Sequence, residues 1–305
     1  MLKGKSFLSV QDLSPAEIES LFRKAAFFKK RPLGSQLRGK AIALLFAKPS
    51  TRTRVSFEVG AAQLGGQALF LQMADLQSGR GEPLGDTART LSRYCSGIVA
   101  RLFSHEGLLE LARFSSVPVI NGLTDLLHPC QALSDLFTIQ EKRSLRSLTL
   151  VYLGDGNNNV AHSLMHACSK LGVHMTVSCP PGYEPRQEIR KDFLQNGKRS
   201  GSRFFLARDP EKAAKGADIL YTDTWVSMGE EKQAKERLQA LGPYQLNARL
   251  LGLARKDCLV MHDLPAFRGR EITAEALEGK QSVVWDQAEN RLHVQKALLA
   301  EIFGK

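Results

Sequence analysis

The sequence predicts an α/β protein of two domains, each built on a parallel β-sheet flanked by helices. Short apolar runs recur along the chain, helix-like segments separate most of them, and the pattern restarts after a polar stretch. Strands that alternate with helices form parallel sheets that are covered on both faces. At 305 residues the chain is long enough for two domains of ordinary size.

The first domain opens with a helix that begins at a capping box. Ser14 is the expected N-cap, Pro15 takes the first helical position, and Glu17 follows three residues after the cap. A glycine-rich, polar stretch later in this half predicts a loop. The expected elements are helix 15–30, strand 40–46, helix 54–64, strand 68–71, loop 72–84, helix 86–93, strand 98–102, helix 106–114, strand 118–120 and helix 130–142.

The polar stretch 140–144 is the expected domain boundary, so the first domain covers residues 1–140 and the second 141–286. The last helix is amphipathic, and we expect residues 287–305 to pack back on the first domain. The remaining expected elements are strand 148–153, helix 160–171, strand 173–178, strand 203–206, helix 209–215, strand 218–222, helices 232–240 and 246–252, strand 258–261 and helix 287–303.

Composition narrows the class of protein. A net charge of +11 without a long Lys/Arg block or an aromatic-rich basic stripe favours a field for a small anion over a nucleic-acid surface. Five scattered cysteines with no C-x-x-C pair indicate a reducing compartment and neither disulfides nor structural zinc. No signal peptide or membrane-length apolar run is evident, so we expect a cytoplasmic protein that contacts no membrane.

The motif Lys-Pro-Ser-Thr-Arg-Thr-Arg at residues 48–54 joins the second expected helix to the strand before it. Free backbone N–H groups and the helix dipole favour an anion at such a turn. Hydroxyls and guanidinium groups at the same place complete a phosphate pocket. The alternative is a helix cap by Ser50 or Thr51 with solvated arginines.

A second motif, His-Pro-Cys-Gln at residues 128–131, follows another strand. A neutral imidazole and a carboxamide N–H can donate to an oxygen that gains charge during a reaction. His128 and Gln131 therefore lie at the carboxyl edge of the sheet, where ligands of α/β proteins bind. Arg101, at the end of its own strand, points to that edge; a structural histidine and a surface arginine are the alternatives.

The order of these motifs resembles that of the aspartate/ornithine transcarbamylase family. Two later stretches extend the resemblance over almost the whole chain: 221–229 is similar to the acceptor-recognition loop of its ornithine-specific members, and 286–291 to a C-terminal family motif. The resemblance implies transfer of the carbamoyl group of carbamoyl phosphate to the δ-amine of L-ornithine. The products would be citrulline and phosphate, as in arginine biosynthesis or a urea-cycle-type step, with no metal or organic cofactor.

The resemblance also implies roles for individual residues, carried over by motif position. The phosphate would be held by Ser50, Thr51, Arg52, Thr53 and Arg101, and the carbamoyl oxygen polarised by Thr53, Arg101, His128 and Gln131. Leu264 would offer its carbonyl to the carbamoyl NH₂, Arg291 would complete this site, and Gln77 matches a glutamine lent to a neighbouring subunit. The family is built on trimers, which implies a homotrimer or a multiple of trimers.

The amino-acid end of ornithine would bind Asp223, Ser227, Met228 and one of Asn158 and Asn159. The run of three asparagines leaves the choice between the last two open. A carboxylate is a suitable partner for the α-ammonium group. On the carbamoyl phosphate side, Arg52 and Arg101 would also stabilise the departing phosphate.

Asp263 departs from the family pattern, because it stands where the family carries a cysteine beside the reacting amine. A carboxylate there either accepts a proton from the amine or holds the amine as an ammonium ion that cannot attack. We expect Asp263 to shift the pH–rate profile toward higher pH.

Two other functions remain open at this point. The acceptor is a different amine, such as putrescine, N-acetylornithine or aspartate, or the chain is a non-catalytic anion-binding module. The loop at 221–229 favours ornithine, and the retention of all the phosphate-site residues favours an enzyme. Dinucleotide binding at Gly154-Asp155-Gly156 is disfavoured, because Asn159 stands where the third glycine of that fingerprint belongs.

Overall fold

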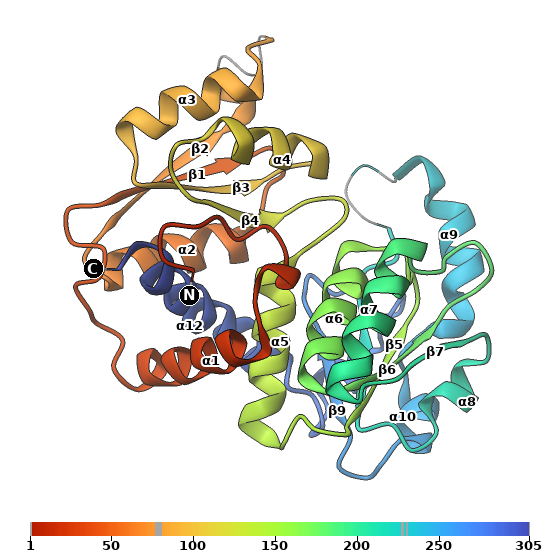
Figure 1. Ribbon diagram of the computed structural model, residues 1–305. Helices are drawn as coiled ribbons and strands as arrows, with labels where there is room; N and C mark the ends of the chain where they lie inside the picture. Colours follow the sequence, from red (N-terminus) through yellow and green to blue (C-terminus); the bar gives the residue numbers. More distant parts are fainter. Residues whose placement is uncertain (1, 77–80, 227–228, 230, 305) are drawn as a thin grey trace. The chain divides into compact units, whose positions relative to one another are not determined.

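A computed structural model describes the chain except residues 1, 77–80, 227–228, 230 and 305 (Figure 1). It divides into two compact units. Unit 1 comprises Met1–Phe137 and Glu289–Lys305, and unit 2 comprises Thr138–Ala288. Helices α5 (Pro129–Lys142) and α12 (Val284–Phe303) each contain one of the two boundaries.

Unit 1 contains a four-stranded parallel sheet in the order β2-β1-β3-β4. Its strands are almost wholly apolar and, except for the edge strand β2, buried, as expected for a parallel sheet with covered faces. The strands are β1 (Ala41–Phe46), β2 (Gln67–Gln72), β3 (Gly97–Arg101) and β4 (Val119–Leu123). The helices that lie wholly in this unit are α1 (Pro15–Lys30), α2 (Thr51–Gln63), α3 (Leu84–Tyr94) and α4 (His105–Phe114), with 3₁₀ turns at η1 (Val10–Asp12) and η2 (Met73–Asp75).

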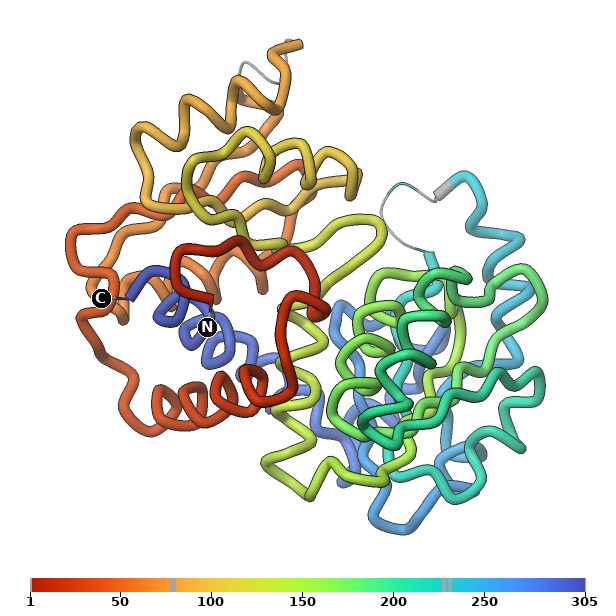
Figure 2. Tube along the Cα trace, in the orientation of Figure 1, coloured from red at the N-terminus to blue at the C-terminus, as the bar shows by residue number. Residues whose placement is uncertain are grey.

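The C-terminal helix α12 packs against α1, and Figure 2 shows the two chain ends, blue and red, side by side. The fully buried Lys296 of α12 donates to the carbonyl of Phe28 at 3.2 Å and to Oε1 of Gln63 at 2.7 Å. These bonds tie α12 to α1 and α2. The expectation that the last helix packs back on the first domain is confirmed.

Unit 2 contains a five-stranded parallel sheet in the order β7-β6-β5-β8-β9. Its strands are β5 (Thr149–Leu153), β6 (His174–Ser178), β7 (Phe204–Ala207), β8 (Ile219–Thr222) and β9 (Leu259–His262). The helices are α6 (Asn159–Leu171), α7 (Gln187–Ser200), α8 (Pro210–Ala214), α9 (Ala234–Leu241), α10 (Ala248–Leu253) and α11 (Ala274–Glu278), with 3₁₀ turns η4 (Glu231–Gln233) and η5 (Gly242–Tyr244). Two buried tyrosines, Tyr152 and Tyr221, stack across β5 and β8 with their ring centroids 5.8 Å apart.

The predicted fold class is confirmed, with four corrections to its elements. Helix α7 lies between two strands where the sequence pattern predicted none, because its buried apolar residues are only Ile189 and Phe193. The short helix α11 was also not predicted. Helix α2 begins at Thr51 and not at residue 54, and α12 begins at Val284 and not at residue 287.

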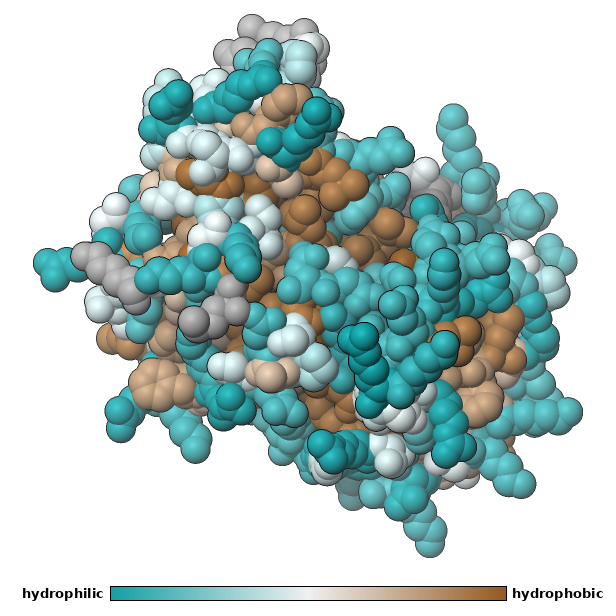
Figure 3. Space-filling model, viewed as in Figure 1, coloured by the Kyte–Doolittle hydropathy of each residue, from teal (hydrophilic) through white to brown (hydrophobic). Residues whose placement is uncertain are grey.

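The face drawn in Figure 3 is mostly hydrophilic, with hydrophobic side chains in separate areas. One such area lies over β7, whose Phe205 and Leu206 are exposed at the edge of the sheet. Among the described residues, no helix combines the length and the apolar character that a membrane crossing requires.

Candidate functional site

The Ser-Thr-Arg motif forms the N-terminus of α2. Ser50 is the N-cap, and its hydroxyl accepts a hydrogen bond from the backbone N–H of Thr53 at 3.2 Å. The Thr53 hydroxyl also accepts from Arg291 of α12 at 2.7 Å, and both side chains are buried. The same turn therefore carries both the helix cap and a contact with a buried arginine.

The side chain of Arg54 makes different contacts. Its guanidinium pairs with Glu58 one helical turn later at 3.0 Å and lies over the ring of Phe70 at 3.7 Å. Both ends of this ion pair are partly exposed. Arg52 and Arg54 of the same motif thus have different surroundings, so a substitution of Arg54 can serve as the control for one of Arg52.

Arg101 ends β3, directly beside the end of β1. Its backbone pairs in register with Phe46, and its carbonyl accepts from the N–H of Ala47 at 2.8 Å. The pairing with β4 shifts by one residue between Ala100 and Arg101, and such a bulge changes the direction of the side chain that follows it. The guanidinium is buried.

His128 precedes α5, and Gln131 lies in the first turn of that helix. The carbonyl of His128 accepts from the Gln131 N–H at 3.1 Å. The side-chain amide of Gln131 donates to Asp135 at 2.8 Å, and its buried Oε1 has no hydrogen-bond partner among the described residues. Gln131 therefore presents an acceptor as well as its remaining N–H.

Burial and three arginines keep His128 neutral. Its pKa lies well below the ordinary value, first because the side chain is desolvated and then because of the charges of Arg291, Arg101 and Arg52. These arginines come from α12, β3 and α2. The result is a cluster with fixed positive charge and one neutral imidazole, called the arginine pocket below, and it is suited to an anion whose other end is a neutral polar group.

Unit 2 holds a second cluster at the carboxyl ends of β5, β8 and β9. Asn158 caps α6 by accepting from the Ala161 N–H at 2.8 Å. Its two amide hydrogens go to the Tyr152 hydroxyl at 2.6 Å and to Asp223 at 3.1 Å. Asn158 thus holds the Asp223 carboxylate, whereas the choice between Asn158 and Asn159 as the ornithine ligand stays a prediction.

Asp263 follows β9 and shares a hydrogen bond with the buried Asp223. Burial raises the pKa of Asp223 well above its usual value; the Asp263 carboxylate and, more weakly, that of Glu271 add to this, and the Thr224 N–H opposes it. Asp223 consequently keeps its proton to a higher pH than an exposed aspartate.

The side-chain atoms of Asp223, His262 and Asp263 lie within 4.8 Å of one another, which is compact enough to consider a metal ion. A backbone N–H only donates, so His262 Nδ1 accepts from Leu264 at 2.9 Å and Nε2 carries the proton that faces Glu271 at 3.2 Å. Neither nitrogen offers a free lone pair. The cluster is therefore a carboxyl pair, not a metal centre.

Two family models match consecutive parts of the chain. The carbamoyl-P binding domain of aspartate/ornithine carbamoyltransferases matches residues 5–141, and the Asp/Orn binding domain matches residues 146–302. The chain belongs to the aspartate/ornithine carbamoyltransferase family. The family relationship inferred from the four motifs is thereby confirmed.

Individual members of the carbamoyltransferase family are close relatives. An ornithine carbamoyltransferase of Methanothermobacter thermautotrophicus is 53% identical over 301 residues, which cover 98% of this chain and 99% of the relative. One described as anabolic, from Pyrococcus furiosus, is 50% identical over 308 residues and covers 99% and 98%. The solved structure of the ornithine carbamoyltransferase of P. furiosus superposes with a TM-score of 0.95 at 50% identity, over 99% of this chain and 98% of that one.

The carbamoyltransferase residues predicted from the sequence fall into three groups. Unit 1 brings together Ser50, Arg52, Thr53, Arg101, His128, Gln131 and Arg291, with Thr51 exposed in the same turn. Unit 2 brings together Asn158, Asp223, Asp263 and Leu264, with Asn159 next to Asn158. Gln77, Ser227 and Met228 lie outside the described residues.

Three residues that support the side chains of the unit 2 cluster were not predicted from the sequence. Tyr152 was visible as a hydroxyl near the carboxyl end of an apolar strand, whereas Glu271 and Arg237 carried no local signal. Glu271 is buried behind His262, and Arg237 forms a buried ion pair with Asp155. The Arg237–Asp155 pair is 82 residues apart in sequence and His262–Glu271 nine, and no motif links either pair, so only the fold reveals them.

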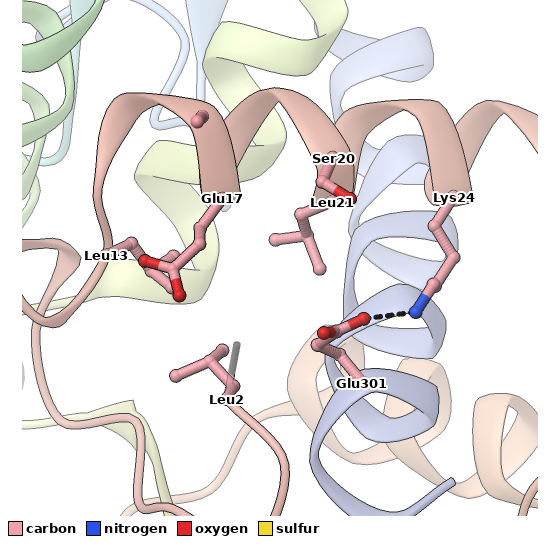
Figure 4. A pocket seen from close by; sticks show the side chains of 8 residues that line it. Leu2, Leu13, Glu17, Ser20, Leu21, Lys24 and Glu301 are labelled. Atoms are coloured by element: carbon pink, nitrogen blue, oxygen red, sulfur yellow. Dashed lines mark hydrogen bonds and ion pairs between the residues drawn. The ribbon is translucent and has the colours of Figure 1, made fainter.

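A cavity of about 370 Å³ lies elsewhere in unit 1 (Figure 4). It is lined mainly by α1 residues and Leu2, and the Lys24–Glu301 ion pair closes one side. None of its lining residues was predicted to bind substrate, and its apolar floor suits no phosphate. We do not assign it to the reaction.

Proposed function

We propose that the protein is an ornithine carbamoyltransferase, which transfers the carbamoyl group of carbamoyl phosphate to the δ-amine of L-ornithine and yields citrulline and phosphate. The observation that carries the choice of acceptor is the buried Asp223 carboxylate, held by Asn158 and placed to receive an ammonium group. The names of the close relatives support the same choice.

On the carbamoyl phosphate side, the positive pocket of unit 1 is suited to the phosphate. Arg52 and Arg101 stabilise the charge that phosphate gains as its bond to the carbamoyl carbon breaks. Neutral His128 donates to the carbamoyl oxygen, which also gains charge. An imidazolium would raise the local positive charge further, so the lowered pKa keeps the donor in its useful form.

Gln131 is assigned a second part beside the one inferred from sequence. One of its N–H groups is committed to Asp135, whereas its Oε1 lacks a partner among the described residues. We therefore assign Oε1 as an acceptor for the carbamoyl NH₂. The carbonyl of Leu264 is proposed for the same group; its backbone φ of +61° and its N–H bond to His262 support a fixed conformation there.

On the acceptor side, Asp223 receives the α-ammonium, and Asp263 takes the position beside the reacting amine. The δ-amine attacks the carbamoyl carbon as a neutral group. The C–N bond forms as the bond between that carbon and the phosphate oxygen breaks, and the proton that the amine loses goes to the departing phosphate. Because the Asp263 carboxylate raises the pKa of Asp223, the acceptor site reaches its anionic form only at higher pH. This supports the proposed shift of the pH–rate profile.

We also propose a homotrimer in the cytoplasm. The trimer is the assembly in which Gln77 would serve a neighbouring subunit. All five cysteines are free and buried, as in a reducing compartment. Sedimentation of the purified protein tests the assembly, and a monomer that is fully active would overturn it.

The function is tested by product analysis with carbamoyl phosphate and four acceptors: ornithine, putrescine, N-acetylornithine and aspartate. Citrulline from ornithine, at a kcat/KM well above that of the other acceptors, is the expected result. Product from another acceptor alone would refute the assignment. Absence of product from all four, with carbamoyl phosphate still bound, would indicate an anion-binding module.

A further inference from the structure

Arg237 of α9 is a buried arginine whose guanidinium bonds to two separate turns of unit 2. Its Nε donates to the carbonyl of Trp225 at 2.6 Å, and its Nη2 forms an ion pair with Asp155. Only 9% of the Arg237 side chain and 6% of the Asp155 side chain are exposed. The other oxygen of Asp155 accepts from the Asn157 N–H at 2.9 Å, so the pair is fixed at both ends.

Both turns carry residues of the proposed acceptor site. Trp225 lies two residues after Asp223, and Asp155 lies three residues before Asn158. Asp223 and Asn158 bond to each other at 3.1 Å. The two turns are thus connected twice, once through the Arg237 guanidinium and once through the bond between Asn158 and Asp223.

The two turns also pack directly on one another. Gly154, with φ of +119°, brings its backbone so close to Trp225 that an added Cβ would lie 2.9 Å from the indole Nε1. This approach leaves no space for a side chain between the turns. Their relative position therefore depends on a close contact and on the guanidinium that bridges them.

Stability alone is a weak reason for such a bridge. A buried ion pair gives up the hydration of two charges, and replacing it with apolar side chains is often neutral or stabilising. A planar guanidinium, however, fixes the direction of two partners at once, which a lysine ammonium does not. The geometry suits precise placement of the two turns.

We propose that Arg237, with Asp155, is a positioning residue for acceptor binding: it holds the turn of Asp223 against the turn of Asn158 in the geometry that receives the amino-acid end of the acceptor. This rests on the proposed function. It assigns no contact between Arg237 and substrate.

The test compares Arg237→Lys and Asp155→Asn with Arg208→Met. Arg208 is a matched control in the same unit, because it also pairs with a carboxylate, Glu184, and donates to a carbonyl, that of Cys179 at 3.1 Å. Among the described residues, none of the bonds of Arg208 goes to either turn of the acceptor site. Citrulline formation gives KM and kcat for ornithine, and calorimetry gives the affinity for carbamoyl phosphate.

We expect the KM for ornithine to rise about 10- to 100-fold in both site variants, with a smaller fall in kcat, since small misplacements of binding groups are costly. Carbamoyl phosphate affinity and the values for Arg208→Met stay within about twofold of the wild type. An unchanged ornithine KM in folded Arg237→Lys, an equal rise in Arg208→Met, or loss of folding in both site variants would overturn the proposal. Failure of the proposed function would instead appear in the wild type, as no citrulline at all.

Discussion

Each unit brings like charges together, but the two units differ in the sign of those charges and in the direction in which a pKa is shifted. In unit 1 the gathered charges are arginines, which cannot lose a proton at any ordinary pH. Burial lowers the pKa of the neighbouring His128, and the charges of the arginines lower it further. In unit 2 the gathered charges are carboxylates, which can take up a proton, and the pKa of Asp223 is raised instead.

This contrast indicates where pH acts on the protein. The arginine pocket keeps its charge over the whole physiological range, so its affinity for a phosphate varies little with the protein's own titration. The carboxyl pair changes its charge with pH and with the arrival of a cation. We therefore expect carbamoyl phosphate binding to be robust and acceptor binding to be the titratable step.

The largest expected effect tests the arginine pocket. Arg52→Met removes a charge at the departing phosphate and should lower kcat/KM about 100- to 1000-fold. Arg54→Met, two residues away, breaks a partly exposed ion pair with Glu58 and the contact with the Phe70 ring, neither of which involves a predicted phosphate ligand, and should leave kcat/KM within a few-fold. Steady-state kinetics of both variants measure this. Equal losses of kcat/KM would show that the two arginines do not have the different roles described.

The next effect tests the carboxylate of unit 2. Asp223→Asn should lower kcat/KM for ornithine by about 10- to 100-fold, the worth of a buried hydrogen bond to a charged group. Asp218→Asn is the control, because Asp218 stands at the opposite end of β8 and bonds to the Thr149 N–H at 2.8 Å. If calorimetry finds the affinity for carbamoyl phosphate reduced as strongly as that for ornithine, the residues that bind the two substrates do not act separately.

A smaller effect sharpens the difference in pH dependence. In Asp263→Cys the carboxylate that helps to raise the pKa of Asp223 is gone, so Asp223 ionises at lower pH. The acid limb of the kcat/KM profile for ornithine should therefore move to lower pH, by on the order of one pH unit. Asp257→Asn, at the exposed start of the β9 region, should leave the profile in place. Superimposable profiles for Asp263→Cys and the wild type would contradict the role given to the pair.

The smallest effect concerns stability. A folded-state pKa of Asp223 above its unfolded value of about 3.8 means that the folded protein loses stability as pH rises from that value through the folded pKa. Asp263→Asn lowers that folded pKa and should stabilise the protein by about 1 kcal/mol at pH 8 and by less at pH 4. Urea unfolding at the two pH values measures it, and a pH-independent difference would rule out the explanation.

Local sequence determined much of this protein. Alternating apolar and helical segments predicted the two parallel sheets, whereas the sequence left the cap of α2 open between Ser50 and Thr51, and the structure has it at Ser50. The phosphate-site residues could be named because they lie in short motifs at strand ends, where a parallel sheet gathers them. Helix α7 escaped prediction because its apolar face consists of two residues in a polar segment.

Tertiary structure decided the parts that depend on distant pairs. Only the fold brings Asp223 against Asp263, Arg237 between Asp155 and the Trp225 carbonyl, and Arg291 onto Thr53. The charge state of a buried group is set by such neighbours, which lie tens to hundreds of residues away. The sequence thus fixed which chemical groups are present at each strand end, and the packing of strands and helices set their protonation and direction.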